Sequence, residues 1–259
     1  MIEAELDCSV LQHDDGSLPR LYDLDVVLAD ERRAAVEVTA AGDQGAIEQW
    51  NLMNGGERWI VPHLAGGWLV EVRIGSRWKR LETELPLLLA ELESLTLSAL
   101  PVHKGTDSDL VRRADNLGVA AAFQSATSFP GSVYMTFDMP AERAGGFIGG
   151  AEGQLATWVS AFLRDARCSD VLDKLASANA DERHAFIFLP GFNTAPFAVN
   201  DLLLRSEPAL PTTAPNLPGR LTHVWIASTW SSGVGMRWTP RGGWLTFDKL
   251  VGDEGIVTV

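Results

Sequence analysis

Residues 21–39, LYDLDVVLADERRAAVEVT, contain two short runs of β-branched and apolar residues separated by a polar turn. Two strands this close along the chain pair most readily as an antiparallel hairpin. Because side chains alternate along a strand, Asp23 and Asp25 share one face of the first strand, and Glu37 and Thr39 share one face of the second. The stretch therefore predicts a hairpin with one apolar face and one face that carries three carboxylates.

Strands and helices alternate along the rest of the chain, which predicts an α/β fold with a mixed sheet. Helix 83–97 is expected to begin at Thr83, a residue type that caps helix N-termini, with Pro86 in its first turn. Residues 144–153, AGGFIGGAEG, contain five glycines and predict a hinge or mobile loop. Further helices are expected at 44–52, 108–117, 154–164, 169–178 and 196–204, and strands at 66–74, 119–123, 132–137, 184–189 and 222–228, followed by a hairpin at 235–247.

The composition is that of a globular protein. The 259 residues are 46% hydrophobic, enough to form a core, and we expect residues 1–259 to form a single globular unit. Acidic residues outnumber basic ones 34 to 21, and the net charge of −13 argues against a general basic nucleic-acid coat, although a local basic face stays open. Two cysteines, no basic signal-like start and no apolar run of about 18 residues predict a cytoplasmic protein without a membrane span.

The carboxylates of the hairpin suggest a divalent-metal site. Phosphodiester hydrolysis by Mg²⁺ or Mn²⁺ needs at least two converging carboxylates and a cation or polar group that orients the attacking water. Asp23, Asp25 and Glu37 on neighbouring strands lie within reach of one another and are the candidate metal ligands. The alternative is that the same carboxylates form a solvated acidic face that keeps the protein soluble.

The pattern resembles the PD-(D/E)xK nuclease superfamily, in which an Asp on one strand is followed by E-x-K on the next. Here the acid is Asp23, Tyr22 stands at the proline position, and the second motif is Glu37-Val38-Thr39, with threonine in place of lysine. In this superfamily the lysine can move to a neighbouring helix, and Lys174 is the one lysine with a suitable helix-then-strand context. Some members carry an extra acid on an N-terminal helix, a role open to Glu3 or Glu5, although the chain leaves little room for that helix.

The resemblance implies a nuclease-like core in residues 1–54 and 151–259, with an α+β insertion at 55–150. It implies a phosphodiesterase acting on nucleic acid, with Asp23, Asp25 and Glu37 holding Mg²⁺ or Mn²⁺ and Lys174 or Thr39 orienting the water. The alternative is a catalytically degenerate protein that kept the fold, lost the lysine and binds a protein partner. The chain also resembles a family of bacterial proteins of no established activity, on stretches such as AVEVTAAGD, ERHAFIFLPGF and LTHVWIASTW.

Other motifs have structural explanations. The stretch FIFLPGFNTAPF resembles the oxyanion loop of α/β-hydrolases, but the chain lacks the G-x-S-x-G elbow. The histidines occur singly, and His184 and His223 are expected to be half-buried at the starts of two strands. The C-terminal tryptophans, interleaved with Arg237 and Arg241, could stack on bases, but a tryptophan-rich core is favoured.

Overall fold

The computed structural model describes residues 1–16, 20–54, 59–100, 108–125, 129–144, 153–230 and 233–249. The chain divides into two compact units: Met1–Gly42 with Gly145–Val259 form unit 1, and Asp43–Ala144 form unit 2. The bounds of unit 2 differ from those of the expected insertion, 55–150, at both ends. Most of the glycine-rich stretch expected to be mobile, residues 145–152, lies outside the described residues.

Unit 1 is built on a seven-stranded mixed sheet with the order β1-β2-β3-β8-β9-β10-β11. Strands β3, β8 and β9 are parallel to their neighbours in this group, and the other pairings are antiparallel. The strands are β1 Ser9–Gln12, β2 Leu24–Val27, β3 Arg33–Ala40, β8 Glu182–Leu189, β9 His223–Ser228, β10 Gly235–Thr239 and β11 Gly243–Phe247. The predicted hairpin is confirmed as β2 and β3, and the mixed α/β class is confirmed as well.

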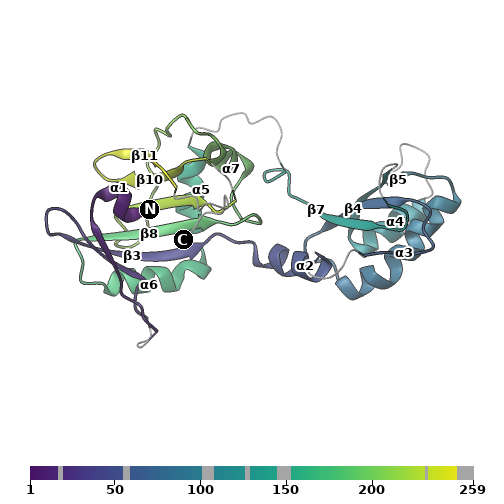
Figure 1. The fold of residues 1–259 in the computed structure, drawn as a ribbon, viewed down its shortest axis with the longest axis horizontal. Helices are drawn as coiled ribbons and strands as arrows, with labels where there is room; N and C mark the ends of the chain where they lie inside the picture. The colour runs from purple at the N-terminus through teal and green to yellow at the C-terminus, as the bar shows by residue number, and fades with distance from the viewer. Residues whose placement is uncertain are drawn as a thin grey trace. The chain divides into compact units, whose positions relative to one another are not determined.

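Helices cover both faces of this sheet (Figure 1). One face packs against α5 Gln154–Phe162, α6 Ser169–Ser177 and α7 Phe197–Leu204, with the short 3₁₀ turn Ala166–Cys168 before α6. The opposite face packs against α1 Ile2–Leu6 around Phe186, Phe188 and Trp225. Residues alternate along β8 between these two cores, and its last six residues are all buried. Its last five residues, AFIFL, therefore form a continuous hydrophobic run, as expected of a parallel strand covered on both sides.

Unit 2 has a four-stranded sheet with the order β5-β6-β4-β7. Its elements are α2 Gln44–Asn54, β4 Gly67–Arg73, α3 Trp78–Ser94, β5 Ala99–Leu100, α4 Ser108–Leu117, β6 Val119–Ser125 and β7 Val133–Asp138. The expected start of α3 at Thr83 is wrong, because the helix begins five residues earlier and the Thr83 hydroxyl donates to the carbonyl of Lys79. Leu81 and Leu85 lie one turn apart and both are buried, so packing extends the helix upstream of Pro86.

Two of the C-terminal tryptophans belong to the core. Trp225 and Trp244 are 1% and 4% exposed, whereas Trp230 is 49% exposed. The core interpretation is therefore confirmed for Trp225 and Trp244. Among the described helices, none is both long and apolar enough to cross a membrane.

Replacing Ile187 by alanine should lower the free energy of unfolding of unit 1. Ile187 is fully buried in the middle of β8, and truncation of such a side chain leaves a cavity that costs about 2–5 kcal/mol. Urea denaturation followed by circular dichroism measures the change, with Leu210→Ala as the control because Leu210 is 46% exposed. Equal effects of the two substitutions would contradict the assignment of β8 to the core.

Candidate functional site

Lys174 reaches Glu37 across 137 residues of sequence. Helix α6 packs against β3 and β8, and Lys174 projects from its last turn toward the sheet. Its Nζ donates to Oε1 of Glu37 at 2.8 Å, and the Lys174 side chain is 16% exposed. The geometry therefore brings together the two residues that the resemblance paired through a lysine moved to a helix.

Glu37 is a buried carboxylate with one unsatisfied oxygen. The residue is 4% exposed, and its Oε2 has no hydrogen-bond partner among the described residues. Burial raises the pKa of Glu37 to about 6, against the lowering effect of the Lys174 hydrogen bond, and the nearby charge of Asp23 adds to the rise. The hydrogen bond to Glu37 raises the pKa of Lys174, so the ammonium stays charged. A carboxyl group with a pKa near 6 can accept or release a proton close to neutral pH.

Asp23 lies across from Glu37 on the same face of the hairpin. The last paired residues of β2 and β3 are Leu24 and Val36, and Asp23 and Glu37 come one step beyond them. Oδ2 of Asp23 accepts the backbone N–H of Val38 at 2.6 Å, which fixes the carboxylate beside β3. Thr39 shares the face of Glu37 by alternation and is half-buried.

Asp25 belongs to a separate network. Its carboxylate accepts from the Tyr22 hydroxyl at 2.8 Å and from Arg33 at 2.9 Å, and lies 2.8 Å from Nδ1 of His13. Burial opposes its ionisation, but Tyr22, Arg33 and His13 together lower the pKa of Asp25 below its usual range. Burial and the bond to Asp25 raise the pKa of Tyr22 to about 12. These partners occupy Asp25, so of the three expected metal ligands the structure leaves Asp23 and Glu37 next to each other.

The short helix α1 supplies acids that do not join this pair. We expected little room for an N-terminal helix, yet Ile2–Leu6 form one and carry both Glu3 and Glu5. Oε1 of Glu3 accepts the N–H of Val10, and Glu5 pairs with Arg237 at 2.9 Å. Because α1 packs on the sheet face opposite Glu37, these carboxylates serve local structure.

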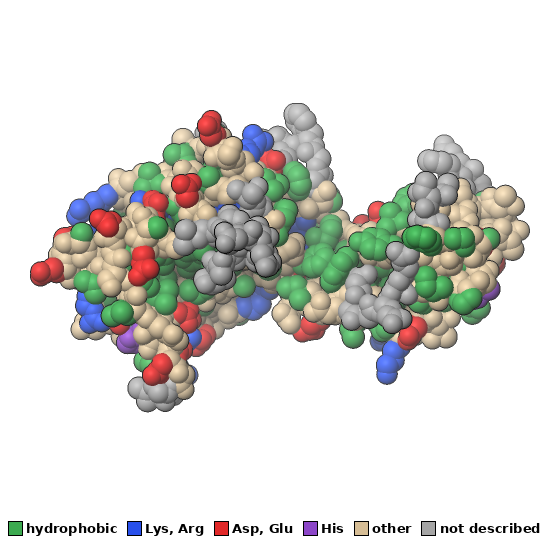
Figure 2. Space-filling model, viewed as in Figure 1, with side chains coloured by type: hydrophobic (Ala, Val, Ile, Leu, Met, Phe, Trp, Pro, Cys, Tyr) green, Lys and Arg blue, Asp and Glu red, His purple; other side chains and the backbone are tan. Residues whose placement is uncertain are grey.

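The hairpin carboxylates do not form a solvated acidic patch. Glu37 is buried, and Asp23 and Asp25 are both half-buried with hydrogen-bond partners. Acidic side chains are instead scattered over the visible surface of unit 1 (Figure 2). Solubility alone therefore does not explain why these three acids share a face.

No family model, no curated protein and no solved structure matches this chain.

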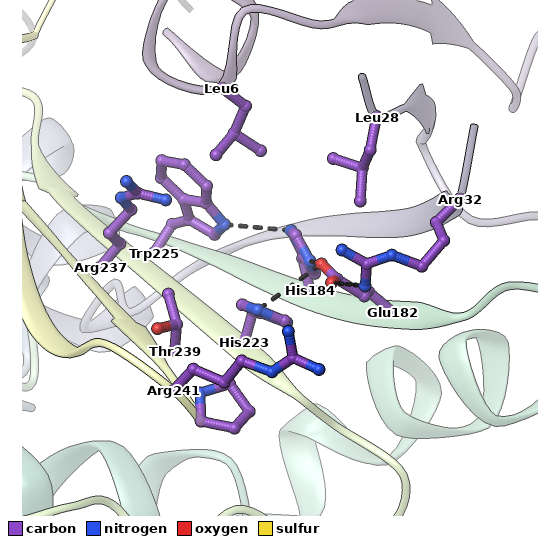
Figure 3. A pocket seen from close by; sticks show the side chains of 11 residues that line it. Leu6, Leu28, Arg32, Glu182, His184, His223, Trp225, Arg237, Thr239 and Arg241 are labelled. Carbon is purple, nitrogen blue, oxygen red and sulfur yellow. Dashed lines mark hydrogen bonds and ion pairs between the residues drawn. The ribbon is translucent and has the colours of Figure 1, made fainter. Parts of the chain in front are cut away.

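A second group of ionisable side chains lies on the other face of the large sheet. His184 and His223 are paired in the parallel register of β8 and β9, with ring centroids 4.2 Å apart. Oε2 of Glu182 lies 2.9 Å from Nε2 of His184 and 3.5 Å from Nε2 of His223 (Figure 3). The two histidines occur singly in the sequence, and only the order of the strands β8 and β9 makes them neighbours.

The ligand atoms of Glu182, His184 and His223 are spaced closely enough to hold a metal ion, but the hydrogen bonds of His184 place its proton on the nitrogen that would bind the metal. One ligand atom from each residue lies within 4.8 Å of the others. The Trp225 indole N–H donates to Nδ1 of His184 at 3.2 Å, so this nitrogen must be unprotonated and Nε2–H donates to Glu182. A metal at Nε2 would require a proton on Nδ1, where it would face the indole N–H. His184 therefore carries its proton on Nε2 and donates it to the Glu182 carboxylate in a hydrogen bond. This hydrogen bond helps to lower the pKa of Glu182 to about 2.

Removing Lys174 should destabilise the protein more at pH 8 than at pH 5. Lys174→Met leaves the Glu37 carboxylate buried without its counter-ion, at a cost of about 2–4 kcal/mol when it is charged. Glu37 has a raised pKa of about 6 in the folded protein, so below that pH it is protonated and the cost falls. Urea unfolding at the two pH values measures this difference, with exposed Lys79→Met as the control. Rescue by Glu37→Gln in the double variant is expected, and an additive double variant would contradict the coupling.

His223 should make the protein acid-sensitive. Burial lowers its pKa in the folded state to about 4, whereas the unfolded chain titrates near 6.5. Between these values the unfolded state binds more protons, so stability falls as the pH drops through this window. His223→Gln should reduce the loss between pH 7 and 4.5 by about 1–2 kcal/mol, allowing for partial solvent screening. Exposed His63→Gln is the control, and identical pH profiles for all three proteins would refute the assignment.

Proposed function

We propose that unit 1 is a divalent-metal-dependent phosphodiesterase that acts on nucleic acid, with a core of the PD-(D/E)xK type. The observation that carries the proposal is the contact of Lys174 with Glu37 beside Asp23. The step from α6, which carries Lys174, to β8 supports it, because this is the helix-then-strand context that the resemblance implies for a lysine moved to a helix.

The donor set suits a hard divalent cation. Two carboxylates lie together, and Oε2 of Glu37 is buried without a hydrogen-bond partner among the described residues. Oxygen ligands of this kind are those that Mg²⁺ and Mn²⁺ prefer. Asp23 and Glu37 would hold the ion, which when bound polarises the phosphodiester and its attacking water.

The chain's own groups would position the water and stabilise the developing charge. Glu37 would act as a metal ligand through Oε2, because Lys174 occupies its other oxygen. The Lys174 ammonium would orient the water and offset negative charge on the phosphoryl oxygens. Thr39, on the same face two residues beyond Glu37, is the second polar group available for that orientation.

A second function follows from the burial of the same pair. Glu37 is 4% exposed and Lys174 occupies one of its oxygens, an arrangement that also suits a fixed ion pair inside a degenerate core. In that case unit 1 would bind a protein partner and cleave nothing. The presence or absence of metal binding separates the two functions.

Glu37→Gln and Asp23→Asn should abolish Mn²⁺ binding measured by calorimetry and lower nuclease activity on single- and double-stranded DNA and RNA by at least about a hundredfold. Lys174→Met should keep metal binding and lose a similar factor in activity, because it removes charge stabilisation. Asp173→Asn is the matched control, since Asp173 is an exposed acid next to Lys174 on α6. A folded wild-type protein that binds neither Mg²⁺ nor Mn²⁺ would eliminate the enzyme and leave the interaction module.

A further inference from the structure

Unit 1 has a pocket of about 300 Å³ on the face of the large sheet opposite Glu37. The register of β3 and β8 places Val36 beside His184 and Glu37 beside Ala185, so the two histidines and Glu37 point to opposite faces. The pocket is lined by the starts of β8 and β9, the end of β10 and the two turns at this edge of the sheet (Figure 3). It is therefore separate from the proposed metal site.

Three arginines from three elements line this pocket. Arg32 extends from the β2–β3 turn, Arg237 lies on β10, and Arg241 comes from the β10–β11 turn (Figure 3). Glu182 is the one acidic residue among the lining side chains of the described chain. Arg32 and Arg237 have carboxylate partners, which leaves the third guanidinium to attract an anion.

The arginines differ in how they are held. Arg32 pairs with Glu182 and with Asp30, which fixes its guanidinium at the pocket wall. Arg237 pairs with Glu5 and lies over the Trp225 ring at 5.3 Å, but its Nε–H is buried with no partner among the described residues.

Arg241 is exposed and forms no ion pair within the part of the chain that the structure describes. Arg241 is thus the cation whose charge is available to a ligand.

The remaining walls add no positive charge and accept a small organic group. Burial lowers the pKa of both His184 and His223, so the imidazoles are neutral at neutral pH. The two leucines Leu6 and Leu28 add an apolar side. The volume is at the lower end of that of small-molecule sites, which suits a ligand of about the size of a mononucleotide.

We infer that this pocket binds a phosphate monoester, with Arg241 and Arg32 contacting the phosphoryl oxygens. A planar guanidinium donates two parallel hydrogen bonds to phosphate oxygens. Arg241 supplies the uncompensated positive charge, and Arg32, already paired with Asp30 and Glu182, supplies further N–H donors. The ligand is a free phosphorylated metabolite or the phosphorylated end of a nucleic-acid strand, because both present the same group. The inference does not depend on metal chemistry at Glu37.

Titration calorimetry with inorganic phosphate, AMP and acetate tests this site on the full chain. We expect saturable binding of phosphate and AMP, with acetate at least about tenfold weaker. Arg241→Gln should weaken AMP binding by at least about tenfold, since a charge-assisted contact is lost. Arg220→Gln removes an exposed arginine outside the pocket and should leave AMP binding unchanged.

A 5′-phosphorylated oligonucleotide separates the two sources of the phosphate. Tighter binding than AMP, with the same loss in Arg241→Gln, identifies a strand end, and weaker binding identifies a metabolite. Absence of saturable phosphate and AMP binding to the wild-type protein, or equal affinity in Arg241→Gln, overturns the inference. Zn²⁺ binding that disappears in His223→Gln would overturn it too, because the pocket would then be a cation site.

Discussion

The parallel pairing of β3 with β8 is the constraint on which unit 1 depends. Seven residue pairs, from Ala34 with Glu182 to Ala40 with Phe188, join the N-terminal hairpin to the chain that returns after unit 2. With β8 in this position, α6 packs against β3, and Lys174 contacts Glu37. It also brings Glu182 and His184 to the same edge as Arg32. Both sites described above are therefore consequences of one strand pairing between distant segments.

The charged side chains on the two faces of this sheet have different surroundings. On the face covered by α6, the Glu37 carboxylate is buried with Lys174 as its partner, which leaves Oε2 without a hydrogen bond among the described residues. The pKa of Glu37 is raised to about 6. On the opposite face Glu182 is surrounded by donors from His184 and Arg32, and it stays ionised throughout the ordinary pH range. The first arrangement suits proton movement, and the second suits the fixed positioning of neighbouring groups.

Local patterns predicted what depends on local structure. Strict alternation placed Asp23 and Glu37 on one face of a hairpin, and a helix-then-strand context singled out Lys174. The histidine pair and the arginine pocket were out of reach, because they depend on β9 lying beside β8 and on the turn after β10. The partners of Asp25 could not be predicted either, because only the fold brings Tyr22, Arg33 and His13 to its carboxylate. The alternation of side chains along a strand predicts which face each side chain points to, whereas the residues it contacts depend on the order of the strands.

The position of unit 2 within the chain has a consequence for biosynthesis. All of Asp43–Ala144 leaves the ribosome after β3 and before β8, so unit 2 is complete while β3 still lacks its parallel neighbour. At the usual rate of translation this interval lasts roughly ten seconds or more. During that time β3 is an open strand edge with apolar side chains on one face, the kind of edge that pairs readily with other chains. The nascent protein thus has a defined window of aggregation risk that closes only when β8 emerges.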